Sequence, residues 1–158
     1  IVGADLTTMR DGMVLNTVFL HRNFEEEWEE LEFTGRIGQT IELALRNERD
    51  IKKMLAKKVR PQPRLDAFQV EPRVSIENSL SDELTVIEVN VRDRIGLLYD
   101  IARVFAELRV DISSAHISTF GEKAVDVFYV TDAHHKKITR DNVRRKLREH
   151  LLAVLETD

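Results

Sequence analysis

The stretch Leu84–Val91 (LTVIEVNV) decides the fold, because it opens a full succession of alternating strands and helices. Its apolar residues predict a strand, and residues 92–96 behind it predict a turn. Two helices are predicted from apolar stripes at helical spacing, one of Leu97, Ile101, Val104, Phe105 and Leu108 and the other of Val143, Leu147, Leu151, Val154 and Leu155. Between them, residues 110–120 and 123–131 predict a hairpin. This order is the start of an α+β, ferredoxin-like βαββαβ sandwich with an antiparallel sheet.

The fourth strand of that sandwich is missing after the last helix, for which Thr139 is the predicted N-cap. The short run Val74–Glu77 lies just upstream of Leu84–Val91 and can pair with it as a hairpin, which would fill the vacant edge. The strand Val125–Thr131 (VDVFYVT) is apolar on both faces apart from Asp126. We therefore expect a second sheet or another chain to cover its outer face.

Part of this unit occurs twice. Residues 3–9 (GADLTTM) match residues 114–120 (SAHISTF), and residues 15–20 (LNTVFL) match residues 125–130 (VDVFYV). The match predicts an earlier hairpin of residues 1–9 and 13–20. We expect a tandem repeat with domains at 1–71 and 72–158, the first copy being truncated at its N-terminus, in a chain that is a piece of a longer protein.

The segment after the first hairpin is predicted to be helical. Its apolar stripe consists of Phe24, Trp28, Leu31, Ile37, Ile41 and Leu45. A break is expected at Thr34-Gly35, and a short further helix over residues 50–57. Pro61 and Pro63 predict an extended connection over residues 59–65, and residues 66–70 would supply the last strand of the first copy.

Composition excludes several classes of function. The net charge is −4, the opposite of what a nucleic-acid-binding domain usually carries, and there are no cysteines for disulfides, thiolate metal sites or a cysteine nucleophile. No apolar run approaches the length of a membrane span. A cytoplasmic protein that binds neither nucleic acid nor membrane is expected.

Known catalytic and phosphate-binding motifs are absent from the sequence. His134 and His135 beside Asp132 are the one arrangement that resembles a metal site, and adjacent residues on a turn rarely face the same ion, so no metal site is expected. The turn from Asp93 to Leu98 is the remaining candidate, because Gly96 lets a ligand approach the backbone and the amides of a helix start can hold a carboxylate. A turn that only caps the helix is the simpler alternative.

Two stretches around this turn resemble the last ACT domain of the bifunctional PII uridylyltransferase/uridylyl-removing enzymes. They are DRIGLLYDIARVFAEL (residues 93–108) and DISSAHISTFGEKAVDVFYVTD (residues 111–132). Residues 4–17 (ADLTTMRDGMVLNT) are similar to the hairpin of the preceding ACT domain in that family. Ile95 stands where the family usually has proline, which loosens the turn but removes no ligand group.

The resemblance implies a cytoplasmic nitrogen sensor. The parent enzyme transfers UMP from UTP to the PII protein with Mg²⁺ and removes it again in a separate hydrolase domain, and neither catalytic domain lies in these residues. The chain itself would then hold no catalytic site and no cofactor. Its partners would be L-glutamine or another small amino acid, the PII protein through the parent enzyme, and further ACT sheets of the same or another copy.

An amino-acid ligand would lie between the turn Asp93–Leu98 and the strand start Asp111–Ser114. Its carboxylate would meet the amides of Gly96, Leu97 and Leu98, with Arg94 as an alternative partner, and its ammonium would meet Asp93. The residues expected to bind the ligand are Asp93, Arg94, Gly96, Leu97, Leu98, Asp111 and Ile112. Three alternatives remain: an ACT sensor of another amino-acid-metabolism or stringent-response enzyme, a dimerisation module without ligand, and a small enzyme.

Overall fold

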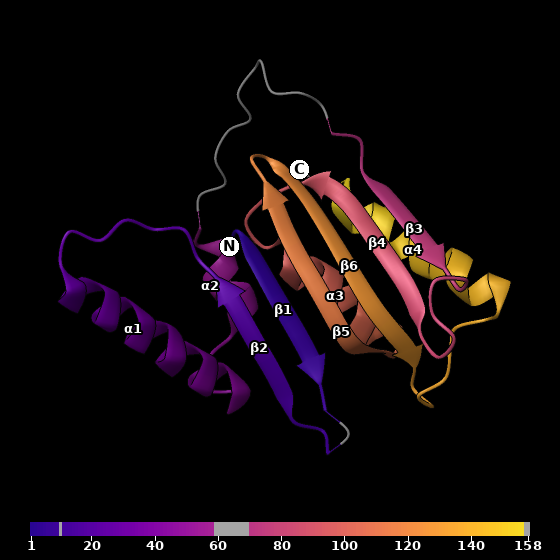
Figure 1. The fold of residues 1–158 in the computed structure, drawn as a ribbon, viewed down its shortest axis with the longest axis horizontal. Coiled ribbons are helices and arrows are strands. Elements are labelled where there is room, and N and C mark those ends of the chain that lie inside the picture. The colour runs from indigo at the N-terminus through magenta and orange to yellow at the C-terminus, as the bar shows by residue number, and fades with distance from the viewer. Residues whose placement is uncertain (10, 59–69, 157–158) are drawn as a thin grey trace. The chain divides into compact units, whose positions relative to one another are not determined.

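A computed structural model describes residues 1–9, 11–58 and 70–156 of the chain. Its strands are β1 (Gly3–Thr8), β2 (Val14–Phe19), β3 (Arg73–Glu77), β4 (Thr85–Arg92), β5 (Val110–Phe120) and β6 (Lys123–Asp132). Its helices are α1 (Glu27–Leu45), α2 (Ile51–Ala56), α3 (Leu97–Glu107) and α4 (Asp141–Leu155). The strands form one six-stranded antiparallel sheet in the order β2-β1-β5-β6-β4-β3 (Figure 1).

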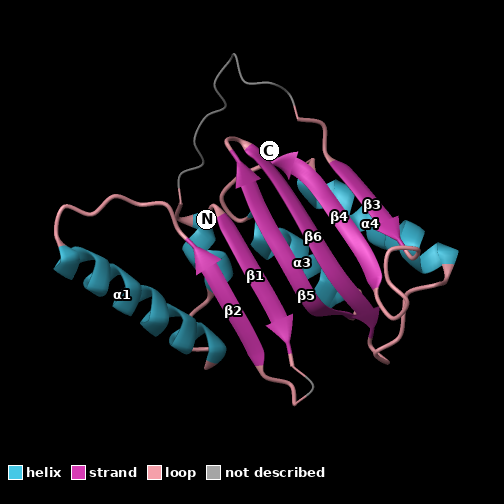
Figure 2. Ribbon diagram, viewed as in Figure 1, coloured by secondary structure: helices cyan, strands magenta, loops and turns pink. Residues whose placement is uncertain are grey.

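Helices α3 and α4 cover one face of the β5-β6-β4-β3 part of this sheet, as Figure 2 shows. They pack against each other, and the core between them and the sheet takes alternate residues of β4 and β6 together with one face of each helix. The buried side chains include Ile87, Val89, Ile101, Val104, Phe105, Phe128, Val130, Leu147 and Leu151. The predicted α+β architecture, its strands and the apolar faces of its two helices are therefore confirmed.

Strand β3 occupies the edge of the sheet that the sequence leaves vacant. It pairs antiparallel with β4, from Arg73 opposite Asn90 to Glu77 opposite Val86. Val74 and Ile76 are buried against the core. The predicted substitution of an upstream strand for the missing fourth strand is confirmed.

The two hairpins meet strand to strand along β1 and β5. Gly3 lies opposite Ser118 and Thr7 opposite Ser114, with Asp5 opposite His116 at the centre. These are the same residues that the repeat makes equivalent, since Asp5 matches His116 in the aligned copies. The hairpins are thus related by a local two-fold axis between Asp5 and His116, and strands from both copies of the repeat join in one sheet within the chain.

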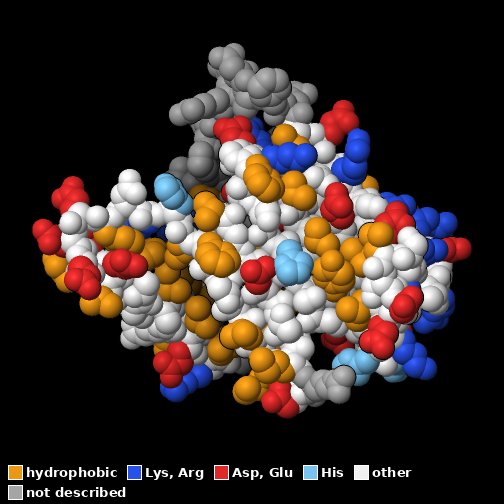
Figure 3. Space-filling view, viewed as in Figure 1, with side chains coloured by type: hydrophobic (Ala, Val, Ile, Leu, Met, Phe, Trp, Pro, Cys, Tyr) orange, Lys and Arg blue, Asp and Glu red, His pale blue; other side chains and the backbone are white. Residues whose placement is uncertain are grey.

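The face of the sheet turned away from α3 and α4 mixes apolar and charged side chains (Figure 3). On β6 it carries Val125, Val127 and Tyr129, all half-buried, while the buried Phe128 and Val130 face the helices. Covering of this outer face by a second sheet or chain stays a prediction.

The chain divides into two compact units, Ile1–Leu20 with Arg64–Asp158, and His21–Pro63. The second unit holds α1 and α2. The expected break at Thr34-Gly35 is wrong, because α1 is continuous and the Thr34 hydroxyl donates within the helix to the carbonyl of Glu30 at 3.0 Å. The short helix is confirmed, with Asp50 as its N-cap. The domain boundary at residue 71 stays a prediction.

Two further predictions have other outcomes. The extended connection over residues 59–65 and nearly all of the strand expected at 66–70 lie outside the described residues. The N-cap of α4 is Arg140 rather than Thr139, because the Arg140 carbonyl accepts the first helical hydrogen bonds, from the amides of Val143 and Arg144 at 3.1 Å. Within the described ranges, every helix is too short or too polar to cross a membrane.

Candidate functional site

The candidate site is the turn between β4 and α3. Its first residue, Asp93, is exposed, and its amide donates to the carbonyl of Glu122 at 2.7 Å, which ties the turn to the β5–β6 hairpin. Gly96 is the N-cap of α3 with φ +85°, a left-handed conformation that favours glycine. No side chain caps this helix start. The turn therefore places backbone amides at the positive end of a helix dipole.

The amides of this helix start are not equally free. The Leu97 amide donates to the carbonyl of Arg94 at 3.2 Å, and the Leu97 side chain is buried in the core. The amides of Gly96 and Leu98 donate no hydrogen bond to any residue that the structure describes. Two of the three amides predicted to receive a carboxylate thus remain open to one, and the third is used within the turn.

Arg94 is a structural clamp rather than an exposed ligand group. Its guanidinium lies 2.7 Å from the Asp100 carboxylate on α3 and donates to the Val154 carbonyl on α4 at 2.8 Å. Only 16% of its side chain is exposed. Both helices thus hold one end of the guanidinium, while its buried Nε has no hydrogen-bond partner among the described residues.

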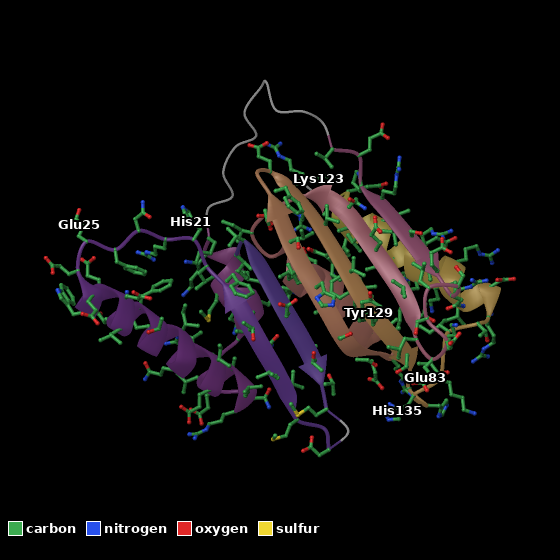
Figure 4. All side chains as sticks on the ribbon, in the orientation of Figure 1. His21, Glu25, Glu83, Lys123, Tyr129 and His135 are labelled. Carbon is green, nitrogen blue, oxygen red and sulfur yellow. The ribbon has the colours of Figure 1, made fainter. Side chains whose placement is uncertain are left out.

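The other predicted segment, Asp111 with Ile112, lies at the far end of the sheet. Strand β5 runs parallel to β4, so the start of β5 and the end of β4 are at opposite ends. Asp111 lies 3.9 Å from His135 there, and the Ile112 carbonyl already accepts a hydrogen bond from the Thr8 hydroxyl at 2.9 Å. In Figure 4, Lys123 at the turn's end of the sheet is far from His135.

The prediction that Asp111 and Ile112 face the turn is therefore wrong. The reason is the crossover: α3 carries the chain back along the whole sheet before β5 begins. The residues near the turn are instead those at the end of β5, where Ser118 pairs with Gly3 of β1 and the Thr119 amide donates to the Val2 carbonyl at 3.2 Å. The seam between the two hairpins thus ends beside the candidate site.

Asp126 is the residue at this end of the sheet whose importance the sequence analysis missed. It lies on β6 opposite Val89 of β4 and Ile117 of β5, on the face that α3 and α4 cover. Its side chain is 0% exposed, and neither carboxylate oxygen has a hydrogen-bond partner among the described residues. Its place as the single acidic residue within the apolar run Val125–Val130 was the signal that could have identified it.

Burial raises the pKa of Asp126 from 3.8 to about 6. The nearby amide of Ser118 favours the charged form without reaching hydrogen-bond geometry to either oxygen, and the negative charge of Asp93 opposes it. The negative charges of Asp93 and Asp126 therefore repel each other.

His134 and His135 lie in a turn that follows β6. The Asp132 carboxylate accepts hydrogen bonds from the amides of His134 and Lys136, both at 2.9 Å, and these bonds lower the pKa of Asp132. Across the described ranges, no three histidine, aspartate or glutamate side chains lie together as a metal site would require. The Asp132 carboxylate therefore stabilises this turn through its hydrogen bonds to the backbone.

Comparison with known proteins gives one family. Residues 73–157 match the sequence profile described as ACR9-like, ACT-like domain. This range runs from β3 to the end of α4 and includes the turn Asp93–Leu98. No solved structure matches the chain. The chain belongs to the ACR9-like, ACT-like domain family.

Proposed function

We propose that the chain is an amino-acid-sensing regulatory module whose ligand is glutamine, bound at the turn Asp93–Leu98. The observation that carries the proposal is the uncapped start of α3, where Gly96 adopts a left-handed conformation and the amides of Gly96 and Leu98 are free within the described residues. A domain of ACT-like type suits small-molecule regulation rather than catalysis.

The turn matches the chemistry of a free amino acid. The two open amides and the helix dipole favour the carboxylate. Asp93, exposed at the other end of the turn, would receive the ammonium group. Arg94 contributes by holding the turn between α3 and α4 and does not contact the ligand.

Glutamine, and a parent enzyme that uridylylates and deuridylylates the PII protein, are proposed on the resemblance of residues 93–108 and 111–132 to the last ACT domain of that family. The repeated hairpin at the start of the chain supports the same parent, because it is similar to the preceding ACT domain. In such a parent, glutamine at this turn would shift the balance from transfer of UMP toward its removal.

Isothermal calorimetry with a panel of amino acids tests the proposal. We expect saturable heat with L-glutamine, and a loss of affinity of at least tenfold in Gly96→Asp, because the new carboxylate blocks the approach and repels that of the ligand. Gly12→Asp is the matched control. Gly12 has the same φ of +85° and lies in the β1–β2 turn. An aspartate there therefore introduces the same backbone strain and charge away from the site.

The Asp93→Ala variant tests the ammonium contact. Loss of a charge-assisted hydrogen bond worth about 1.5–3 kcal/mol predicts glutamine binding roughly 10- to 100-fold weaker. If the unmodified chain gives no heat with any amino acid at millimolar concentration, the sensing function is refuted. If Gly96→Asp and Asp93→Ala both fold and bind as the parent does, the ligand binds elsewhere.

A pairing module without ligand is the second candidate, favoured by the seam between β1 and β5. Two hairpins joined about a local two-fold axis resemble an assembly contact carried within one chain. This function predicts no amino-acid heat and no effect of Gly96→Asp on the seam. The calorimetric panel therefore separates the two candidates.

A further inference from the structure

Among the described residues, no cation balances the buried carboxylate of Asp126. Both oxygens are enclosed and unpartnered, and no lysine, arginine or histidine of the described strands, α3 or α4 forms an ion pair with it. A buried charge without partner or hydrogen bond is costly, so such groups are normally protonated or paired with a cation. Asp126 is therefore poised to accept a positive charge.

The described charged groups around Asp126 do not supply this positive charge. Arg94 in the turn is held by Asp100 on α3 and by the Val154 carbonyl on α4. Arg92 at the end of β4 pairs with Glu122 at 3.0 Å. Asp93 adds a second negative charge close enough to act on Asp126. The end of the sheet that holds the open amides of α3 thus also holds two carboxylates that repel each other.

A cation placed between two such carboxylates removes both the repulsion and the cost of burial. An ammonium group suits this position, because its three donors can serve the orphaned oxygens of Asp126 and also reach Asp93. The amides at Gly96 and Leu98 supply the complementary site for a carboxylate on the same turn. A zwitterion would therefore satisfy both halves.

We infer that Asp126 receives the ammonium group of the amino-acid ligand, with Asp93 as its exposed second partner. The inference rests on the proposed function. Asp126 is fully enclosed in the unliganded chain, so the segments that cover it have to move to admit the ligand. The site is consequently formed by ligand binding rather than open beforehand.

The test compares two probes that differ only in the ammonium group, L-glutamine and glutaramate. In the unmodified chain we expect glutamine to bind at least tenfold more tightly than glutaramate at pH 7.5. In Asp126→Asn this preference should vanish through a loss of glutamine affinity, with glutaramate affinity unchanged. Asp82→Asn, at an exposed position, is the matched control and should keep the preference.

Proton release gives a second readout in the unmodified chain. Because an ammonium partner stabilises the ionised form of Asp126, glutamine binding at pH 6 should release about half a proton per chain, seen as a difference in heat between two buffers of unlike ionisation enthalpy. No release, or a preference retained in a folded Asp126→Asn, overturns the inference while leaving glutamine sensing intact. Absence of glutamine heat in the unmodified chain overturns the proposed function itself.

Discussion

Among single residues, Asp126 determines the electrostatics of the candidate site. Its carboxyl is placed in the core by strand alternation, since every second residue of β6 faces the helices. An apolar residue there would give a conventional strand, and aspartate instead leaves a group that ionises only at a cost. Such a group makes the stability of the unliganded chain depend on pH.

The free energy of unfolding should fall as pH rises from about 4 to about 6. The folded chain holds the Asp126 proton to a pKa of about 6, whereas the unfolded chain releases it near 3.8, so the folded state binds more protons in this window. The contribution of this one group is on the order of 3 kcal/mol, present at low pH and lost above pH 6. Urea titrations of the parent and of Asp126→Asn from pH 4 to 7 check it.

The difference in stability between parent and variant isolates this group from all others. It should shrink or reverse in favour of Asp126→Asn as pH rises, and stay constant above pH 7. A difference that is independent of pH between 4 and 7 would show that Asp126 titrates normally in the folded chain.

Strand β3 is decisive at the scale of elements, because it completes the sheet from upstream. Its pairing with β4 covers an edge that would otherwise expose a row of unpaired amides and carbonyls. Helix α4 packs on this strand as well as on α3. The fold of the ACT-like domain therefore depends on β3, the strand that precedes β4 and α3 in the chain.

Ile76→Ala should destabilise the chain by about 2–4 kcal/mol, because Ile76 is 4% exposed and its removal leaves a cavity between β3 and the core. The midpoint of urea unfolding measures the effect. Glu77→Ala, one residue along the strand and exposed, should change stability by less than about 0.5 kcal/mol. Equal effects of the two substitutions would mean that β3 is not part of the folded core.

Elements with a clear hydrophobic period could be predicted from the sequence, and contacts that depend on topology could not. The stripe on α3 and the alternation in β4 follow from the residues themselves. The prediction that Asp111 faces the turn is wrong because β5 runs parallel to β4 after the crossover. Its first residues therefore lie at the opposite end of the sheet. The contacts of Arg94 could not be predicted, because its partners, Asp100 and Val154, lie on two helices that only the tertiary fold brings together.

The seam between β1 and β5 organises the first unit at the scale of the whole molecule. It brings the repeated residues into register about Asp5 and His116, whose side chains lie 2.7 Å apart. The repeat in the sequence thus reappears as a symmetric pairing of strands, which a sequence alignment could suggest but not orient. One end of this seam lies beside the turn that begins α3.

Removal of residues 1–20 should expose the edge of β5 to solvent. The Thr119 amide donates to the Val2 carbonyl at 3.2 Å, so its hydrogen exchange should accelerate by at least tenfold in the shortened chain. The Asp93 amide, which donates to Glu122 away from the seam, should exchange as before. Unchanged exchange at Thr119 would mean that β1 does not pair with β5 in solution.

The most direct test of amino-acid sensing at this turn is an NMR titration of the ¹⁵N-labelled chain with L-glutamine. We expect saturable amide shifts that concentrate on Gly96, Leu98 and the neighbourhood of Asp126, with little change at Asp111 and Ile112 at the opposite end of the sheet. Shifts that cluster at Asp111 and Ile112 instead, or a spectrum unchanged at millimolar glutamine, would contradict amino-acid sensing at this turn.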